Sequence, residues 1–237
     1  MTETWQVTFE ISRVKTNQKP RFDHFTLDIN PDEYVLDGVE KIWAFHDRSL
    51  VFSHACHHST CGACGMLVNG VEKLTCITPI RSVTRNGGSI RVEPMRNFPV
   101  ISDLSVDMSV FYQRMESVGQ LPVVPLGYET IKGKFDPDDD LLRLSDCIEC
   151  GLCISACPIA LTTPGYLGPA VLAGAQQSGD LNPCTLELVD SENGAWRCHS
   201  AYECTEVCPS HVDPAWRIME LRKQLIAKRI KKFFGLK

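Results

Sequence analysis

Two cysteine runs of nearly the same spacing constrain this chain more than any other feature of its sequence. The first run reads Cys147-x2-Cys150-x2-Cys153-x3-Cys157 and is followed by proline. This is the ligand run of bacterial-type ferredoxins, in which the fourth cysteine of each run binds the cluster of the other run. The spacing is too specific to arise by chance, and it predicts two iron-sulfur clusters with crossed ligands.

The second run, at residues 198–208, departs from the first at one position. It reads Cys198-x2-Ala201-x2-Cys204-x3-Cys208, so that alanine stands in the place of the second cysteine. Crossing the ligands gives one cluster Cys147, Cys150, Cys153 and Cys208, and the other cluster Cys157, Cys198 and Cys204. Because an alanine side chain cannot bind iron, the first set predicts [4Fe-4S] and the second predicts [3Fe-4S]. Water or hydroxide holding a fourth iron at the second set is the alternative.

A third constellation lies in the N-terminal half and has the plant-type spacing of a [2Fe-2S] cluster. Its ligands are Cys56, Cys61, Cys64 and Cys76. Gly62 and Gly65 are predicted to supply positive φ angles and open N–H groups that hydrogen-bond the sulfurs. A zinc site would more often pair two Cys-x2-Cys units, and only one such unit is present here.

Two histidines follow the first of these ligands. A Rieske centre would need a second cysteine with a nearby histidine, and none of the other three ligands supplies one. We therefore expect His57 and His58 to be exposed loop residues, with hydrogen bonding to the cluster as the alternative. Cys184 fits neither run and is expected to be a small buried residue or a plain loop residue.

Hydrophobic periodicity predicts a small mixed domain that closes near residue 100. Apolar residues alternate with polar ones along 5–11 and 25–29, which predicts two paired strands, and recur at helical spacing along 35–43. Further short strands are predicted at 66–68, 74–77 and 90–92. A helix is predicted over 103–117, a charged loop over 133–140, and mostly helices in the remainder.

Charge and hydropathy limit the partners. The formal net charge of −5 is uneven, because residues 217–237 carry eight basic residues and one acidic residue and leave −12 on residues 1–216. The acidic body disfavours nucleic acid. We find no apolar stretch long enough to span a bilayer and neither an export signal nor a transit peptide. We expect reduced thiolates rather than disulfides, and a peripheral position on the cytoplasmic face of a prokaryotic cell membrane.

The basic C-terminal segment also carries an apolar stripe at helical spacing. The stripe comprises Ile218, Leu221, Leu225, Ile230 and Phe233. It predicts a helix that lies on an anionic membrane surface or packs on a membrane partner. The alternative, a helix packed in the protein core, applies best to the part before residue 226.

The three cysteine groups in this order, the connecting stretch RVEPMRNFPVISDLSVDMSVFY and Gly168–Ala170 resemble one family over almost the whole chain. This is the iron-sulfur subunit of succinate dehydrogenase and fumarate reductase, respiratory complex II. The resemblance implies an α+β fold. An N-terminal β-grasp plant-type [2Fe-2S] ferredoxin domain, residues 1–103, would precede an all-α bacterial-ferredoxin-like domain, residues 104–237.

The same resemblance implies a function in respiration and the tricarboxylic acid cycle. Electrons would pass between the FAD of a flavoprotein subunit and membrane quinone through the [2Fe-2S], [4Fe-4S] and [3Fe-4S] clusters, with membrane anchor subunits as further partners. The flavin chemistry would lie on the partner chain, which agrees with the lack of a Gly-rich dinucleotide fingerprint here. No catalytic residue is expected on this chain.

Quinone contacts of the family carry over in part. Pro158 and His199 match, and Ala201 stands where the quinone site is lined, whereas the tryptophan expected shortly after Cys157 is missing. For His199 a hydrogen bond to the nearby cluster is an equal alternative.

The sequence also leaves two other functions open. The first is the electron-transfer subunit of another flavin-linked reductase, of the thiol-dependent fumarate reductase or 2-hydroxyacid oxidase type. The second is a zinc-stabilised binding scaffold.

Overall fold

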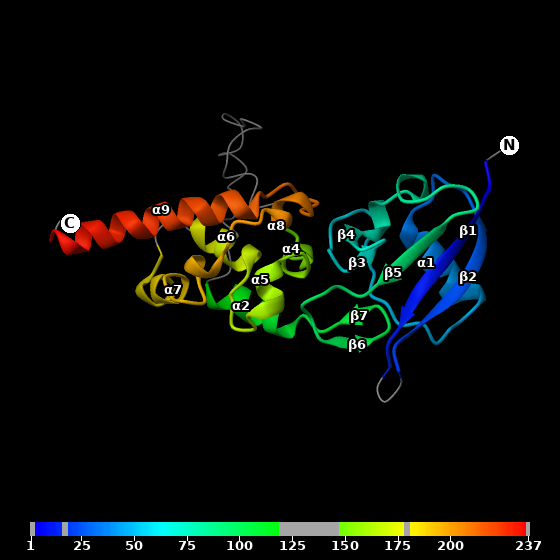
Figure 1. Cartoon of the computed structure of the whole chain (residues 1–237), viewed down its shortest axis with the longest axis horizontal. Coiled ribbons are helices and arrows are strands. Elements are labelled where there is room, and N and C mark those ends of the chain that lie inside the picture. The colour runs from blue at the N-terminus through cyan, green and yellow to red at the C-terminus, as the bar shows by residue number, and fades with distance from the viewer. Residues whose placement is uncertain (1–2, 16–18, 119–146, 178–180, 236–237) are drawn as a thin grey trace, which may run out of the picture. The chain divides into compact units, whose positions relative to one another are not determined.

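A computed structural model describes residues 3–15, 19–118, 147–177 and 181–235 (Figure 1). The chain forms two compact units. The N-terminal unit comprises Met1–Met108 and Ile148–Ala156, and the C-terminal unit comprises Ser109–Cys147 and Cys157–Lys237. The charged loop predicted over 133–140 lies outside the described residues.

The N-terminal unit is built on a five-stranded mixed sheet. Its strand order is β2-β1-β5-β3-β4, with β1 parallel to β5 and the other neighbours antiparallel. The strands are β1 (Trp5–Arg13), β2 (Arg21–Ile29), β3 (Gly65–Val68), β4 (Val71–Leu74) and β5 (Ser89–Glu93). A separate ribbon pairs β6 (Val100–Ser102) with β7 (Ser105–Val106). This arrangement confirms the strands predicted at 5–11, 25–29, 66–68 and 90–92.

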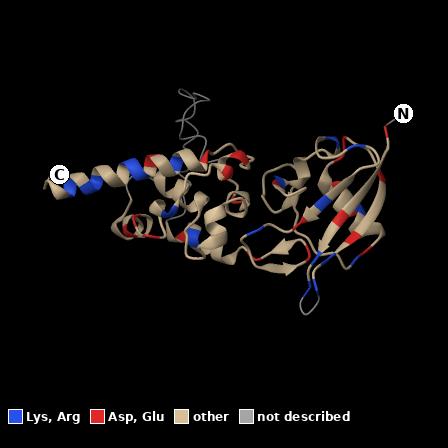
Figure 2. Ribbon diagram, in the orientation of Figure 1, with Lys and Arg blue, Asp and Glu red and all other residues tan. Residues whose placement is uncertain are grey.

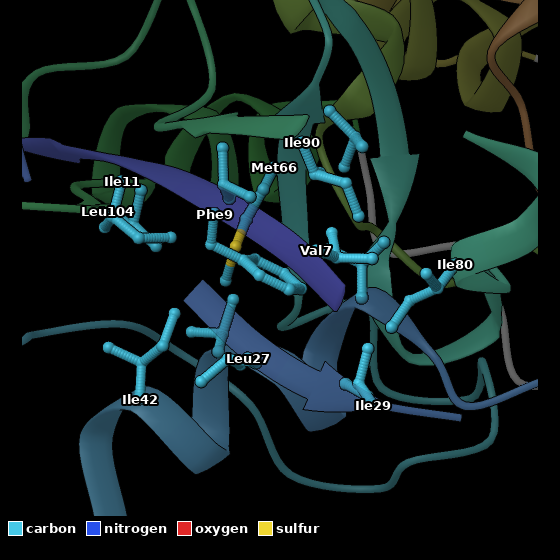
Figure 3. Close-up of a cluster of buried hydrophobic side chains, with 14 of the residues drawn as sticks. Val7, Phe9, Ile11, Leu27, Ile29, Ile42, Met66, Ile80, Ile90 and Leu104 are labelled. Atoms are coloured by element: carbon cyan, nitrogen blue, oxygen red, sulfur yellow. The ribbon is translucent and has the colours of Figure 1, made fainter. Parts of the chain in front are cut away.

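The core of this unit lies between the sheet and α1 (Val35–Phe45), as Figure 3 shows. The alternation read from the sequence places Val7, Phe9 and Ile11 on the buried face of β1, and all three are fully buried. Residues at helical spacing on α1, such as Val39 and Ile42, meet them. Burying one large apolar side chain is worth roughly 1.5–3 kcal/mol, so this cluster dominates the stability of the unit.

Two predicted boundaries are wrong. The strand predicted at 74–77 ends at Leu74, and Thr75–Ile77 forms a 3-10 turn, η1. Here the N–H and the hydroxyl of Thr75 both donate to the carbonyl of Cys64, which turns the chain away from the sheet. The helix predicted over 103–117 begins only at Ser109, because Asp103 takes a left-handed φ of 49° in the turn between β6 and β7.

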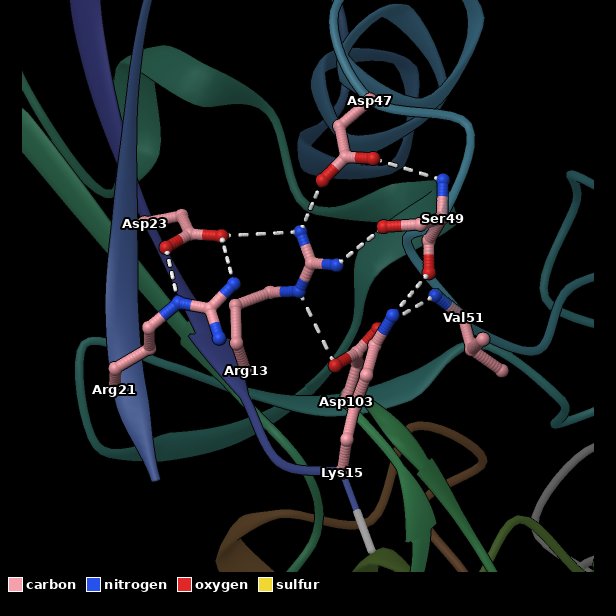
Figure 4. Close-up of polar contacts among 8 residues, drawn as sticks. All are labelled: Arg13, Lys15, Arg21, Asp23, Asp47, Ser49, Val51 and Asp103. Atoms are coloured by element: carbon pink, nitrogen blue, oxygen red, sulfur yellow. Dashed lines mark hydrogen bonds and ion pairs between the residues drawn. The ribbon is translucent and has the colours of Figure 1, made fainter. Parts of the chain in front are cut away.

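A buried guanidinium ties four segments of the N-terminal unit together (Figure 4). Arg13, at the end of β1, pairs with Asp23 of β2 at 3.2 Å, with Asp47 after α1 at 2.5 Å and with Asp103 at 3.2 Å. The side chains of Arg13 and Asp103 are 1% and 0% exposed. The Arg13 guanidinium, with the hydroxyl and N–H of Ser49, holds the pKa of Asp47 well below its usual range. This cluster fixes the start of the loop that carries the first cysteine group.

Among the described residues of the C-terminal unit, all regular secondary structure is helical, which agrees with the prediction of mostly helices. Its helices are α2 (Ser109–Ser117), α5 (Pro158–Thr162), α6 (Pro169–Gln177), α7 (Pro183–Val189), α8 (Glu203–Glu206) and α9 (Pro214–Phe233), with the short turn η3 (Ala195–Arg197). The long helix α9 is capped at its N-terminus by Asp213, whose carboxylate accepts the N–H of Trp216 at 3.3 Å. It packs on α6, and together these two helices frame the unit (Figure 1).

The apolar stripe of α9 divides into two parts. Ile218, Leu221 and Leu225 are buried, as the core alternative predicted, whereas Ile230 and Phe233 are 51% and 84% exposed. Lysine and arginine gather on the same exposed end, as Figure 2 shows. Across the described ranges, no helix has the length and apolar character that a membrane-spanning helix needs.

Candidate iron-sulfur cluster sites

The loop before β3 presents the first predicted ligand with its sulfur already hydrogen-bonded. The backbone N–H groups of Thr60 and Cys61 each donate to Sγ of Cys56 at 3.3 Å, and that of His58 donates at 3.5 Å. The N–H groups of His58 and Cys61 are the main reason that the pKa of Cys56 falls to about 6. Such donors favour a thiolate, which is the form that binds iron.

The remaining plant-type ligands surround the same loop. Cys76 arrives on η1, beside Cys64 at the start of β3. Burial, with the neighbouring thiol of Cys64, raises the pKa of Cys76 to about 12, and the charge of Cys56 adds to this shift. The structure therefore brings the four predicted [2Fe-2S] cysteines to one place, with Cys61 exposed and Cys64 and Cys76 buried.

The shape of this loop depends on residues with left-handed backbone. Gly62 has a φ of 70°, as predicted, and a Cβ there would lie 2.8 Å from the Cα of Cys150. Gly65 was predicted to have a positive φ, and this is wrong because it opens β3 in extended conformation. His57 and Ser59 carry the positive φ instead, at 58° and 59°. Residue type gave no signal for these two positions.

Residues 148–156 of the 147–157 run belong to the N-terminal unit. They contain the short helix α4 (Leu152–Ser155), which places Cys153. The hydroxyl of Ser155 donates to the buried carboxylate of Glu72 at 2.9 Å and accepts the N–H of Arg96 at 2.9 Å. The close approach of Gly62 to Cys150 belongs to the same unit. Two of the predicted [4Fe-4S] ligands thus stand beside the [2Fe-2S] loop.

The other two ligands of that set lie in the C-terminal unit. Cys147 and Cys208 both pack against the buried residues Ala173 and Val212. The N–H of Val212 donates to Sγ of Cys208 at 3.4 Å. The sulfur of Cys208 therefore has a hydrogen-bond donor of the kind that supports a thiolate ligand.

A pocket in the C-terminal unit is lined by all three cysteines of the predicted [3Fe-4S] set. Burial raises the pKa of Cys157, and it raises that of Cys204 to about 12. The N–H of Ser200 donates to Sγ of Cys198 at 3.4 Å. Ala201 lines the same pocket, so its methyl group occupies the wall where a fourth thiolate would stand. A set of three thiols beside an alanine fits [3Fe-4S] better than a complete cubane.

Two residues that support this pocket were missed by sequence reasoning. Tyr166 lines the pocket and is 1% exposed, and burial, with the charges of Cys198, Cys157 and Cys204, raises its pKa above the ordinary range. Arg222 on α9 donates to the carbonyls of Cys198 and Ala195 and so fixes the start of the second run. Tyr166 lies beyond the end of the first cysteine run and Arg222 lies on a later helix, and no motif marks either residue.

The structure also places the predicted quinone-site residues and the cysteine that was assigned to no cluster. Pro158 and His199 line the pocket of the predicted [3Fe-4S] set together with Ala201. Cys184 is exposed in the first turn of α7, so the expectation of a buried or loop residue is wrong. None of the twelve cysteines is joined to another in a disulfide.

This fold and these sites define a two-domain iron-sulfur protein of the ferredoxin type. Residues 8–113 match the family described as 2Fe-2S iron-sulfur cluster binding domain, and residues 143–212 match the 4Fe-4S dicluster domain. Both matches confirm the α+β prediction of a β-grasp ferredoxin domain followed by a helical one.

Similar proteins of known name identify the family more closely than the two domain matches do. The fumarate reductase iron-sulfur subunit of Mycobacterium tuberculosis is 34% identical over 241 residues, covering 96% of each chain. That of Haemophilus influenzae is 33% identical over 221 residues, covering 84% of each. A chain of the Mycobacterium smegmatis Sdh1 complex in the apo form has the same fold, with a TM-score of 0.80, 23% identity, and coverage of 96% of this chain and 98% of that one. The chain belongs to the family of iron-sulfur subunits of succinate dehydrogenases and fumarate reductases.

Proposed function

We propose that this chain relays electrons between the FAD of a flavoprotein subunit and a membrane quinone, as the iron-sulfur subunit of a respiratory complex II. One observation carries the proposal: the loop of the [2Fe-2S] ligands lies directly against Cys150 of the next ligand run. The third group follows closely, because the four-residue step from Cys153 to Cys157 spans at most about 14 Å when extended. Short distances between successive clusters are what an electron relay requires.

The ligand sets are part of this proposal. Cys56, Cys61, Cys64 and Cys76 hold [2Fe-2S]; Cys147, Cys150, Cys153 and Cys208 hold [4Fe-4S]; Cys157, Cys198 and Cys204 hold [3Fe-4S]. The common pocket of the third set and the hydrogen-bonded sulfur of Cys56 support these assignments. The clusters supply the redox chemistry, whereas the chain supplies thiolates, N–H donors and exclusion of water.

We place the quinone end of the relay at the [3Fe-4S] pocket. Pro158, His199 and Ala201 line this pocket, and they are the residues at which the chain matches the family pattern for quinone contact. The imidazole of His199 would orient the quinone or hydrogen-bond the cluster. No tryptophan lies shortly after Cys157, and Tyr166 and Tyr202 are the phenol side chains that line the pocket.

The partners follow from the family. A flavoprotein subunit receives or donates electrons at the [2Fe-2S] end, and membrane anchor subunits hold the chain as a peripheral subunit of a membrane complex. We further propose that it lies on the cytoplasmic face of a prokaryotic membrane. The boundary between the two ferredoxin-type domains is proposed at residues 103 and 104, near the end of the continuous part of the N-terminal unit at Met108.

Electron paramagnetic resonance of the purified, cluster-loaded chain tests the proposal, with iron and sulfide counted on the same sample. We expect a [3Fe-4S] signal in the oxidised state, [2Fe-2S] and [4Fe-4S] signals after dithionite reduction, and about nine irons per chain. A complete [4Fe-4S] cluster at the third site would contradict the role given to Ala201. A colourless protein without iron would contradict the whole relay.

A second measurement separates the quinone-linked function from the thiol-linked alternative. The assembled complex should oxidise succinate or reduce fumarate only when a quinone or quinol is the electron partner. Activity with a thiol donor in place of quinol would favour the alternative.

A further inference from the structure

Three side chains with metal-binding atoms meet on the N-terminal unit, apart from the cysteines. Glu40 comes from α1, and His54 and His57 come from the loop that carries Cys56. Nδ1 of His54 lies 3.1 Å and Nε2 of His57 lies 3.2 Å from the same oxygen, Oε1 of Glu40. The two imidazole nitrogens are 3.4 Å from each other. The three atoms therefore form a nearly equilateral triangle.

This triangle has the size of three corners of a zinc coordination tetrahedron. Zinc binds imidazole nitrogen and carboxylate oxygen at about 2.0–2.2 Å, so ligands at tetrahedral angles lie about 3.3–3.6 Å apart. The measured separations of 3.1, 3.2 and 3.4 Å approach that range without any rearrangement. A fourth corner, away from the triangle, is left for water.

A metal ion would satisfy the three atoms together. Each imidazole nitrogen faces both the carboxylate oxygen and the other imidazole nitrogen. Imidazole nitrogen and carboxylate oxygen both carry lone pairs that can bind a cation. An ion at the centre of the triangle would therefore receive one lone pair from each of the three atoms.

The local structure holds the ligands in place. The ring of Phe52 stacks on that of His54, with centroids 5.0 Å apart and planes 18° from parallel. His57 has a left-handed φ of 58°, a conformation that costs energy in a non-glycine residue, and its imidazole reaches Glu40 on α1. The side chains of His54 and His57 are 37% and 44% exposed, so an ion can enter from solvent.

We propose that Glu40, His54 and His57 form a site for a divalent transition-metal ion, with zinc as the best match. Imidazole ligands suit zinc, copper, nickel and iron, whereas magnesium and calcium prefer oxygen ligands alone. An ion here would join α1 to the loop on either side of Cys56. The site uses no cysteine, so it is independent of the cluster assignments and of the proposed electron relay.

The test is zinc binding to the full-length, cluster-loaded chain in a Cys184→Ser background, because Cys184 is exposed and would itself bind zinc. Equilibrium dialysis against Zn²⁺ should show one zinc per chain at unchanged iron content. Zinc-edge X-ray absorption should show two imidazole nitrogens and oxygen, without sulfur. Glu40→Gln, His54→Asn and His57→Asn should each weaken binding at least about ten-fold, the loss caused even by removing a partner behind a ligand.

His58→Asn is the matched control, because this exposed histidine lies in the same loop and outside the triangle. It should bind zinc as the parent does. If a histidine variant loads its clusters poorly, Glu40→Gln remains decisive, since it alters only the surface of α1. Failure of the parent to bind zinc, sulfur in the zinc spectrum, or unchanged affinity in Glu40→Gln would each overturn the proposal.

Discussion

At the scale of single residues, the type proposed for the third cluster depends on Ala201. Ala201→Cys would complete the ligand pattern of the second run, and Ala201 already lines the pocket of the other three thiols. We expect the variant to assemble [4Fe-4S] at this site, lose the oxidised-state paramagnetic signal and hold about ten irons in place of about nine. Electron paramagnetic resonance with iron counting measures both changes. Ala201→Val, which adds bulk without a ligand, is the control, and an unchanged signal in Ala201→Cys would contradict the assignment.

The second prediction at the residue scale concerns the replacement of Arg13. Arg13→Leu would leave Asp103 buried without its cation, and breaking such a pair costs about 3–5 kcal/mol of the free energy of unfolding. Denaturant unfolding, followed by a probe in the N-terminal unit, measures the loss. Arg21→Leu is the matched control: this arginine is 51% exposed, its ion pair with Asp23 is partly screened, and its loss should cost at most about 1 kcal/mol. Equal losses in the two variants would contradict the buried network.

The same network gives a pH dependence. The pKa of Asp47 is lower in the folded protein than in the unfolded chain. The ionised carboxylate therefore adds to the free energy of unfolding above its unfolded pKa of about 4, and this contribution is lost as pH falls toward the folded pKa. The stability difference between the parent and Arg13→Leu should therefore narrow below about pH 4.

At the scale of elements, the sequence predicted β1, β2, α1 and β5, because each carries a local period that decides its own buried face, and β3, whose four residues are all buried. Prediction from the sequence failed where contacts between residues far apart in the sequence determine the backbone conformation. The double hydrogen bond from Thr75 to Cys64 ends β4, and the buried pair of Arg13 with Asp103 delays α2. Neither contact leaves a pattern in neighbouring residues.

The exposed C-terminal end of α9 gives a prediction at the scale of elements. Ile226, Ile230, Phe233 and Phe234 are between 46% and 84% exposed beside Lys228, Lys231 and Lys232. An apolar edge flanked by lysines fits an anionic membrane surface. Replacing the three lysines by glutamine should weaken binding to anionic vesicles by about 3 kcal/mol, or roughly a hundred-fold.

Co-sedimentation with vesicles measures this change on the cluster-loaded full chain. Neutral vesicles and a variant with Lys15, Lys19 and Lys41 replaced by glutamine are the controls, because the latter removes the same charge from the N-terminal unit. Equal binding to neutral and anionic vesicles would show that α9 does not meet the lipid surface through its charge.

At the scale of the whole molecule, the iron-sulfur cofactors could be predicted from cysteine spacing, because ligand spacing is covalent and local. The ligand sets assigned from the same spacing stay a prediction. Tyr166 in the pocket wall, Arg222 at the start of the second run, and the triangle of Glu40, His54 and His57 could not be predicted in this way. Their members come from separate elements, and only the folded chain brings them together. Local sequence thus indicates the cofactors, and tertiary packing determines what surrounds them.

The two units should differ in their dependence on the clusters. The N-terminal unit has a continuous apolar core under a hydrogen-bonded sheet, whereas the [3Fe-4S] pocket is framed by α5 and α8, helices of five and four residues that are too short to be stable alone. Because cluster binding contributes folding free energy, its removal should loosen the pocket first. Hydrogen exchange of the cluster-free chain should show lost protection in 157–162 and 198–208 and retained protection in β1, β2 and β5. The buried first half of α9 is the internal control, and uniform loss across both units would mean that the sheet itself depends on the clusters.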